Sequence, residues 1–185
     1  MNALEDIDII SHQAALGGFG STYSDYLQVN CLGISNILDI IKKNNLSIKK
    51  IVFASTQSVY GEGSYYCKEH KEVNVVTRNL NQLESKCWEL KCHTCNKILK
   101  PIATSESKSI DTMHMYATSK YIGERILTSA CNELEIGLSI LRYSLVFGPR
   151  EAPFRILSLF SKKMFNRESI LLHEDGNQLR DFIYV

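Results

Sequence analysis

The sequence lacks any strong excess of charge and any long hydrophobic run. Its net charge is +1 over 185 residues, so nothing in the composition favours a nucleic acid or a membrane as a partner. No apolar run approaches the length of a membrane span, and residues 1–12 lack the basic start and apolar core of a secretory signal. We therefore expect a cytoplasmic protein that forms one domain, or part of a larger one.

The cysteines are unevenly distributed. The six are Cys31, Cys67, Cys87, Cys92, Cys95 and Cys131. Four fall between positions 67 and 95 in a chain without an export signal, which favours a metal over disulfides. Cys67 and His70 form a Cys-x2-His pair and Cys92 and Cys95 a Cys-x2-Cys pair, the set that a tetrahedral structural zinc requires. Cys87 is a bystander or a substitute ligand, and the alternative of incidental free thiols stays open.

Apolar patterns alternate between strand and helix. Buried strands are predicted at 7–11, 49–55 and 138–143, and helices at 23–44 and 112–133. This alternation implies right-handed crossovers and a parallel sheet with helices on both faces, an α/β fold of the doubly wound type. A helix at 153–166 and short strands at 170–173 and 180–185 are expected to follow.

Residues 62–106 interrupt the alternation, because they are polar and cysteine-containing with little apolar periodicity. We expect them to form a small zinc-ribbon-like insertion, stabilised by its metal. The expected divisions of the chain are therefore 1–61, 62–106, 107–150 and 151–185.

Tyr116 and Lys120 are four residues apart at the start of the predicted helix at 112–133. Positions i and i+4 lie on one helix face, so the phenol and the ammonium can point into the same pocket. A nearby ammonium favours the charged phenolate and lowers its pKa from about 10 toward neutrality. The pair is a candidate acid/base group for a substrate hydroxyl, although a surface tyrosine beside a surface lysine gives the same spacing.

Three loops that follow predicted strands, at 13–18, 55–61 and 143–149, are expected to converge on one rim of the sheet. The hydroxyl of Thr56 could then hydrogen-bond the same substrate oxygen as Tyr116. The alternative is that Thr56 caps a turn. His12, His93, His114 and His173 have no partner at a useful spacing and are expected to be loop or packing residues, as Cys31 and Cys131 are within helices.

At these positions the chain resembles the extended short-chain dehydrogenases that act on nucleotide sugars. The matching segments are 11–15 (SHQAA), 26–33 (YLQVNCLG), 51–62 (IVFASTQSVYGE), 116–120 (YATSK), 141–150 (LRYSLVFGPR) and 176–185 (GNQLRDFIYV). The resemblance implies a partial Rossmann-like fold, NAD as cofactor and a homodimer formed through the two long helices. Cys67 and His70, with 88–95 (WELKCHTC) and 99–104 (LKPIAT), are similar to the dTDP-L-rhamnose 4-epimerase branch of the family.

The resemblance implies roles for individual residues. Tyr116 would be the acid/base, Lys120 would tune it and bind the nicotinamide ribose, and Thr56 would complete the catalytic set and contact the substrate. Arg180 would pair with the diphosphate of the nucleotide sugar. The residues expected to border the dinucleotide are Ala14, Ala15, Asn30, Ser55, Tyr116, Lys120 and Tyr143.

The chain also departs from the family's pattern. It has no initial strand with a Gly-x-x-Gly-x-x-Gly turn for the pyrophosphate, so we expect an internal piece of an enzyme, with cofactor binding by this piece open. Leu145 replaces a common asparagine. Gln57 and Ser58 stand where dehydratases of the family carry an acidic pair, which favours a C4 epimerase acting through a 4-keto sugar. The alternatives are a 4,6-dehydratase or reductase, and a non-catalytic zinc-containing relic or interaction module.

Overall fold

The computed structural model describes residues 2–17, 20–73, 75 and 77–185. The chain divides into two compact units. The first unit runs up to Gly61 and includes Ser109–Tyr143; the second consists of Glu62–Lys108 and Ser144–Val185. Each unit is considered by itself.

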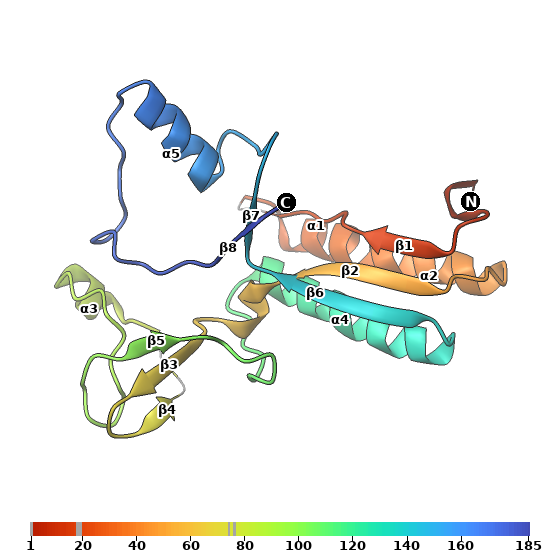
Figure 1. The fold of residues 1–185 in the computed structure, drawn as a ribbon. Helices are drawn as coiled ribbons and strands as arrows, with labels where there is room; N and C mark the ends of the chain where they lie inside the picture. The colour runs from red at the N-terminus through yellow and green to blue at the C-terminus, as the bar shows by residue number, and fades with distance from the viewer. Residues whose placement is uncertain (1, 18–19, 74, 76) are drawn as a thin grey trace. The chain divides into compact units, whose positions relative to one another are not determined.

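The first unit is a three-stranded parallel sheet with two helical connections (Figure 1). Its elements are η1 (Asn2–Leu4), β1 (Ile9–His12), α1 (Tyr23–Leu27), η2 (Gln28–Leu32), α2 (Gly33–Lys43), β2 (Lys50–Thr56), η3 (Gln57–Tyr60), α4 (Met115–Glu133) and β6 (Gly137–Tyr143). The strand order is β1-β2-β6, with Ile10 opposite Ile51 and Ile51 opposite Leu138. The parallel α/β arrangement predicted from the alternation is confirmed.

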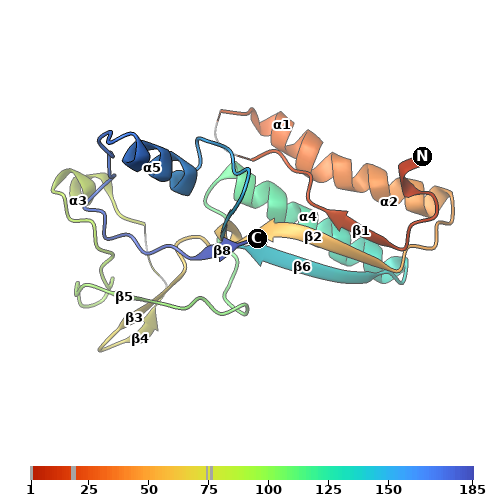
Figure 2. The same cartoon turned by 45° about the horizontal axis from the view of Figure 1, so that its top comes forward.

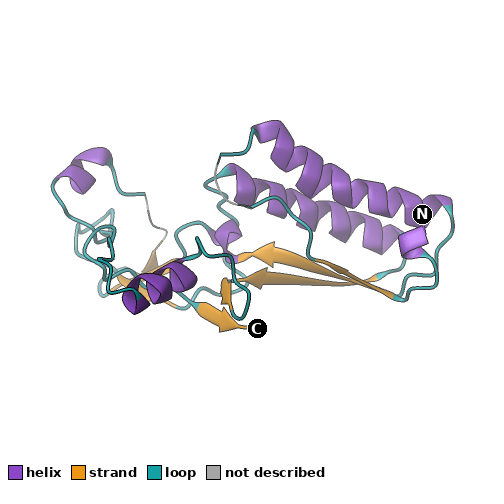
Figure 3. Ribbon diagram, turned by 90° about the horizontal axis from the view of Figure 1, so that it is seen from above, coloured by secondary structure: helices purple, strands orange, loops and turns teal. Residues whose placement is uncertain are grey.

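The helices of this unit cover one face of its sheet, as Figures 2 and 3 show for α2 and α4. The expectation of helices on both faces is therefore wrong for the described part of the chain. The reason is topological: β1, β2 and β6 advance across the sheet in one direction, and right-handed crossovers made in one direction place every helix on the same face. A second layer requires the strand order to reverse.

One apolar core joins these helices to the sheet. It contains Ile34, Leu38, Ile41, Ile48, Ile51, Phe53, Leu127, Cys131 and Ile136, each no more than 7% exposed. Cys131 thus packs as a small hydrophobe, as expected. Gly123 allows α4 to approach closely, because a Cβ there would lie 2.9 Å from Ile34 Cδ1 and 3.0 Å from Phe53 Cζ.

The predicted helix at 23–44 forms, but it contains a π-helical turn, η2, that the pattern did not indicate. The N–H of Gly33 donates to the carbonyl of Gln28, five residues earlier. α4 begins at Met115, later than the predicted position 112, because Nδ1 of His114 accepts a hydrogen bond from the N–H of Ala117 and caps the helix.

The second unit contains two small sheets and two helices (Figure 1). Its elements are β3 (Ser64–Cys67), β4 (Lys71–Val73), α3 (Leu80–Glu84), β5 (Lys100–Ile102), β7 (Leu145–Phe147), α5 (Ile156–Phe165) and β8 (Phe182–Tyr184). The order β4-β3-β5 is antiparallel, whereas β7 and β8 pair in parallel. α5 and β8 correspond to predicted elements, but the strand predicted at 170–173 does not form.

In the described part of the chain no helix has the combination of length and apolar character that a transmembrane helix needs.

Candidate active site and metal centre

Lys120 is buried in the first unit, on the second turn of α4. Its residue is 2% exposed, and Nζ lies 4.4 Å from the centroid of the Phe53 ring on β2. Burial lowers the pKa of Lys120 to about 8, and the carboxylate of Glu124 one turn later partly opposes this change. His12 stacks on Phe53 at 5.8 Å, and burial together with the Lys120 charge lowers the pKa of His12.

Tyr116 lies one turn before Lys120, between an aromatic ring and bare backbone. The ring of His114 is parallel to it, with the centroids 6.1 Å apart, so His114 has a role beside Tyr116 that sequence reasoning missed. On the loop after β1, a Cβ at Gly17 would lie 3.7 Å from Cε2 of Tyr116. The backbone of this loop therefore lies beside the phenol, and Ala14 and Ala15 in the same loop are exposed.

Asn30 fixes this loop against α4. Its Oδ1 accepts from the N–H of Leu16 at 2.7 Å, and its Nδ2 donates to the Leu16 carbonyl at 3.0 Å and to Ser119 Oγ at 2.9 Å. Ser119 in turn donates to the carbonyl of Tyr116. Both N–H groups of the Asn30 amide are thus used inside the chain, which orients the loop and the catalytic helix together. A direct contact of Asn30 with a dinucleotide stays a prediction.

Thr56 is the last residue of β2 and lies opposite Tyr143 on β6, so these two predicted residues are neighbours at the carboxyl end of the sheet. Thr56 Oγ1 accepts from the N–H of Ser58 and bonds its hydroxyl, each at 3.2 Å, so Thr56 caps η3. The capping interpretation therefore describes its present contacts. Gly61 ends this loop with φ of +65°, where a Cβ would lie 2.8 Å from the carbonyl oxygen of Asp111.

A buried ion pair that sequence reasoning missed lies one turn beyond Lys120. The carboxylate of Glu124 accepts from Arg142 Nε at 3.0 Å and Nη2 at 2.7 Å, and from Ser55 Oγ at 2.5 Å. Arg142 also donates to the Tyr60 hydroxyl, and the Glu124 hydrogen bonds raise the pKa of Arg142. Ser55, predicted to border the cofactor, thus bonds Glu124. The i, i+4 spacing of Lys120 and Glu124 was the available signal.

Arg180 lies in the second unit and is exposed. Its guanidinium donates to the Leu179 carbonyl at 2.8 Å and to Gln178 Oε1 at 2.6 Å, both on its own segment. Because these acceptors are local and solvent-accessible, an anionic ligand could replace them at small cost. Its predicted pairing with a diphosphate stays a prediction.

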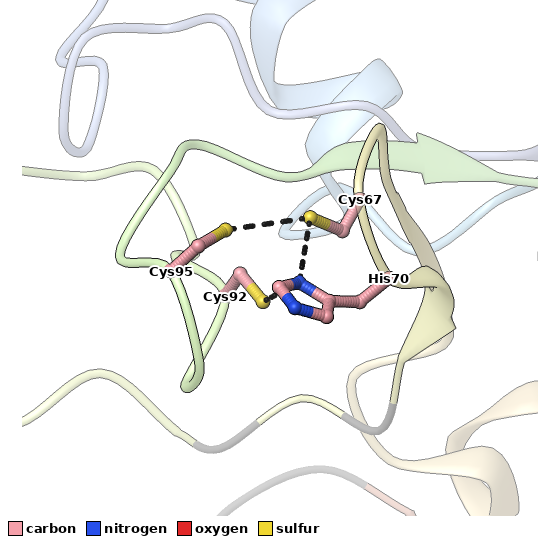
Figure 4. A group of neighbouring side chains, drawn as sticks. All are labelled: Cys67, His70, Cys92 and Cys95. Atoms are coloured by element: carbon pink, nitrogen blue, oxygen red, sulfur yellow. Dashed lines mark hydrogen bonds between the residues drawn. The ribbon is translucent and has the colours of Figure 1, made fainter.

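The structure brings Cys67, His70, Cys92 and Cys95 together, with their side chains pointing toward one another from two turns (Figure 4). Their ligand atoms all lie within 4.8 Å of one another. Cys67 Sγ is 3.6 Å from Cys95 Sγ, and His70 Nδ1 is 3.5 Å from both Cys67 Sγ and Cys92 Sγ. A tetrahedral zinc with bonds of about 2.3 Å to sulfur and 2.0–2.1 Å to nitrogen has edges of about 3.8 and 3.6 Å. The cluster therefore fits a zinc ion without rearrangement.

Backbone hydrogen bonds make this cluster suitable for thiolate ligands. The N–H groups of Cys95 and Thr94 face the sulfur of Cys92, and they lower its pKa to about 6. The N–H of His70 acts in the same way on the pKa of Cys67. Cys87 lies outside the cluster, which answers the question of a substitute ligand for the described residues.

The parallel sheet, its one-sided helices and the loops at its carboxyl end define a Rossmann-type α/β protein. The profile of the family described as "NAD dependent epimerase/dehydratase family" matches residues 1–185, and the chain belongs to this family.

Two relatives illustrate the similarity. The chain is 30% identical over 188 residues to the putative UDP-glucose 4-epimerase of Methanocaldococcus jannaschii, covering 98% of this chain and 49% of that protein. It is 29% identical over 185 residues to the dTDP-L-rhamnose 4-epimerase of Burkholderia thailandensis, covering 96% of this chain and 50% of that protein. The chain thus spans about half the length of these relatives.

Among solved structures, the chain is similar to the UDP-glucuronic acid 4-epimerase of Bacillus cereus in complex with NAD. The TM-score is 0.72 at 26% identity, with 99% of this chain and 47% of that chain covered. It is also similar to the UDP-N-acetylglucosamine 4-epimerase of Methanobrevibacter ruminantium, with a TM-score of 0.70 at 27% identity over 99% of this chain and 49% of that one.

Proposed function

We propose that the protein is an NAD-dependent enzyme that inverts C4 of a nucleotide sugar through a 4-keto intermediate. The observation that carries the proposal is the placement of Tyr116 one turn from the buried cation of Lys120, beside the bare backbone of the loop after β1. The similarity to proteins described as 4-epimerases of nucleotide sugars supports the same reaction.

The chain's own residues fit the nicotinamide half of the cofactor. Ala14, Ala15 and Gly17 expose small side chains and backbone next to Tyr116, which leaves room for a flat ring and its ribose. Asn30 holds this loop, and Ser55, Lys120 and Tyr143 would complete the border. The chemistry that bound NAD+ supplies is reversible hydride acceptance at C4.

In the proposed mechanism Tyr116 accepts the proton of the C4 hydroxyl as the hydride leaves C4. The Lys120 cation stabilises the resulting charge on the phenolate before and after this transfer, and the Thr56 hydroxyl bonds the same sugar oxygen. After the 4-keto sugar turns over, Tyr116 returns the proton to the C4 oxygen as hydride arrives on the opposite face. Arg180 holds the diphosphate throughout.

The residues that follow Thr56 favour epimerisation over dehydration. Loss of water from the sugar requires an acid and a base near C5 and C6. The η3 turn offers Gln57 and Ser58 at its start, and neither side chain titrates in the relevant range. A 4,6-dehydratase or a non-catalytic module therefore remains the alternative that product analysis tests.

The test is Tyr116→Phe in the protein at its natural length, assayed with UDP- and dTDP-sugars by product analysis. We expect turnover to fall by at least about a hundredfold, because an acid/base group contributes 10²–10⁴-fold, while sugar-nucleotide binding is retained. Tyr121→Phe, on the same helix, is the matched control and should keep its activity. Unchanged turnover in Tyr116→Phe, or a dehydrated product from the wild type, would contradict the proposal. The failure of wild type to bind NAD+ would favour the non-catalytic module.

We also propose that Cys67, His70, Cys92 and Cys95 bind one structural zinc ion in a zinc-ribbon-like insertion spanning 62–106. The tetrahedral edge lengths support this metal, and four protein ligands leave no position open for catalysis. Elemental analysis of the purified protein should find one zinc per chain. Cys92→Ser should abolish binding, whereas Cys87→Ser should retain it. Equal zinc content in both variants would rule out this ligand set.

We propose in addition a homodimer formed through the first unit's helices. Leu27, Val29 and Leu32 expose 42%, 44% and 52% of their surface along α1 and η2, which supports an apolar contact. Sedimentation of wild type and of Val29→Lys tests it: the variant should be monomeric at concentrations where wild type is dimeric.

A further inference from the structure

The segment that carries Arg180 is held at one point. Within 171–185, every residue of which is described, Glu174 is the one residue that is not exposed. Its carboxylate lies 2.8 Å from Nη1 of Arg78, and the two side chains are 17% and 22% exposed. Both residues belong to the second unit. The position of the segment between α5 and β8 therefore depends strongly on Arg78.

Arg78 is in turn held by the loop that carries two of the cysteines. The same Nη1 donates to the carbonyl of Trp88 at 3.0 Å. The neighbouring carbonyls, of Cys87 and Glu89, accept from Gln82 of α3 at 3.0 and 2.7 Å. The backbone around Trp88 is thus the platform on which the Arg78 guanidinium rests.

The Trp88 platform continues directly into the Cys/His cluster. The N–H of Leu99 donates to Leu90 at 2.9 Å, and the N–H of Cys92 donates to Lys97 at 2.8 Å, which closes the loop. The apolar core beneath it consists of Cys67, Leu90, Cys92 and Leu99, so two of its four buried members are metal-ligand candidates. Such a core is too small to keep the loop closed without an additional cross-link.

We propose that metal in the Cys/His cluster anchors the Arg180 segment through Arg78 and Glu174, so that metal loading controls how Arg180 is presented to a diphosphate. The inference rests on the proposed function for the zinc ion and for the role of Arg180. Metal keeps the Trp88 carbonyl in place, the carbonyl orients the guanidinium, and the guanidinium holds Glu174, six residues before Arg180.

The anchoring is tested by tryptic cleavage after Arg180, followed by mass spectrometry of the zinc-loaded protein. Cleavage of a native segment reports the population of its open form. We expect chelation of zinc to accelerate cleavage after Arg180 by about tenfold, the factor that loss of a charge-assisted hydrogen bond gives. Cleavage after Arg167, which lies before the anchored segment, is the internal reference. Glu174→Gln should give the same acceleration while zinc remains bound, and Glu168→Gln should not.

The second arm measures the affinity for UDP and dTDP. Chelation and Glu174→Gln should each weaken binding of the nucleotide about tenfold, with NAD+ affinity unchanged. If zinc binds but chelation and Glu174→Gln leave cleavage after Arg180 unchanged, the anchoring is wrong while the proposed function stands. If purified protein binds no zinc, the metal proposal and the anchoring both fail. If wild type binds neither nucleotide, the role of Arg180 fails, and the cleavage rates still decide whether the anchor exists.

Discussion

The cores of the two units differ in what fills them. The first unit packs nine buried residues between α2, α4 and the sheet, and all but Cys131 are aliphatic or aromatic. The second unit buries Cys67, Leu90, Cys92 and Leu99, and α5, every residue of which is described, contributes none. Burial of apolar surface can stabilise the first unit by itself, whereas the second requires the cross-link that a metal supplies. The chain thus combines two solutions to the same problem.

Removal of the metal is expected to have the largest effect and to be confined to the second unit. Structural zinc contributes on the order of 10 kcal/mol to the folding of small domains, so chelation should unfold much of 62–106. Hydrogen exchange should show loss of protection in β3 and β5 with none in α2, α4 or β2. Cys87→Ser is the matched control, since Cys87 lies outside the cluster and should keep the wild-type pattern. Loss of protection in both units together would contradict this division of stability.

A charge deleted inside the first unit should cost more than one deleted on its surface. Glu124→Gln leaves the Arg142 guanidinium without its carboxylate, although Arg142 is a quarter exposed, so we expect a loss of about 2–3 kcal/mol in the free energy of unfolding. Glu133→Gln on the same helix breaks a pair with Lys42 in which both side chains are more than 60% exposed, and should cost less than about 1 kcal/mol. Denaturant titrations measure both, and equal losses would show that the buried pair is not special.

The buried cation of Lys120 should make the stability of the first unit depend on pH. In the folded chain Lys120 loses its proton at about pH 8, and in the unfolded chain at about 10.5. Between these values the unfolded chain binds more protons, so raising the pH stabilises the folded chain. The cost of burying the charge is complete below about pH 8 and absent above about pH 10.5.

The measurement is the unfolding free energy of wild type relative to Lys120→Met across that window. The difference should shift in favour of wild type by no more than about 3 kcal/mol as the pH rises. Glu124 on α4 and His12 on β1 are the titratable groups that interact with Lys120, and His12 titrates at lower pH. A difference that does not change between pH 8 and 10.5 would mean that Lys120 is solvated.

Elements whose cause is local were predictable from the sequence. The period of Ile34, Leu38 and Ile41 predicts α2 because burial of one helix face produces that period. The run Ile170, Leu171 and Leu172 has strand character as well, yet forms none, because a strand also requires a partner edge that a local run does not supply.

Features whose cause is distant in sequence were missed. The π-helical turn has no compositional signal, since Asn30 is held there by Leu16 and by Ser119, 89 residues later. At the site, the spacing of Tyr116 and Lys120 and of the two cysteine pairs was visible, because neighbours on one helix or turn are close by construction. Arg142 was not found, because its contact with Glu124 joins a helix to a strand.

The smallest predicted effect compares two glycines of the first unit and differs in sign. A Cβ at Gly123 would meet Ile34 and Phe53 at 2.9 and 3.0 Å, in the tightest part of the core. Gly123→Ala should therefore cost about 1–2 kcal/mol, the overpacking penalty less the gain in helix propensity. Gly33 has helical backbone angles and nothing within 4 Å of a Cβ, so Gly33→Ala should stabilise by up to about 1 kcal/mol. Denaturation midpoints that move in the same direction for both variants would show that α4 can shift away from the sheet, and that the first unit's core is less tightly packed than its contacts imply.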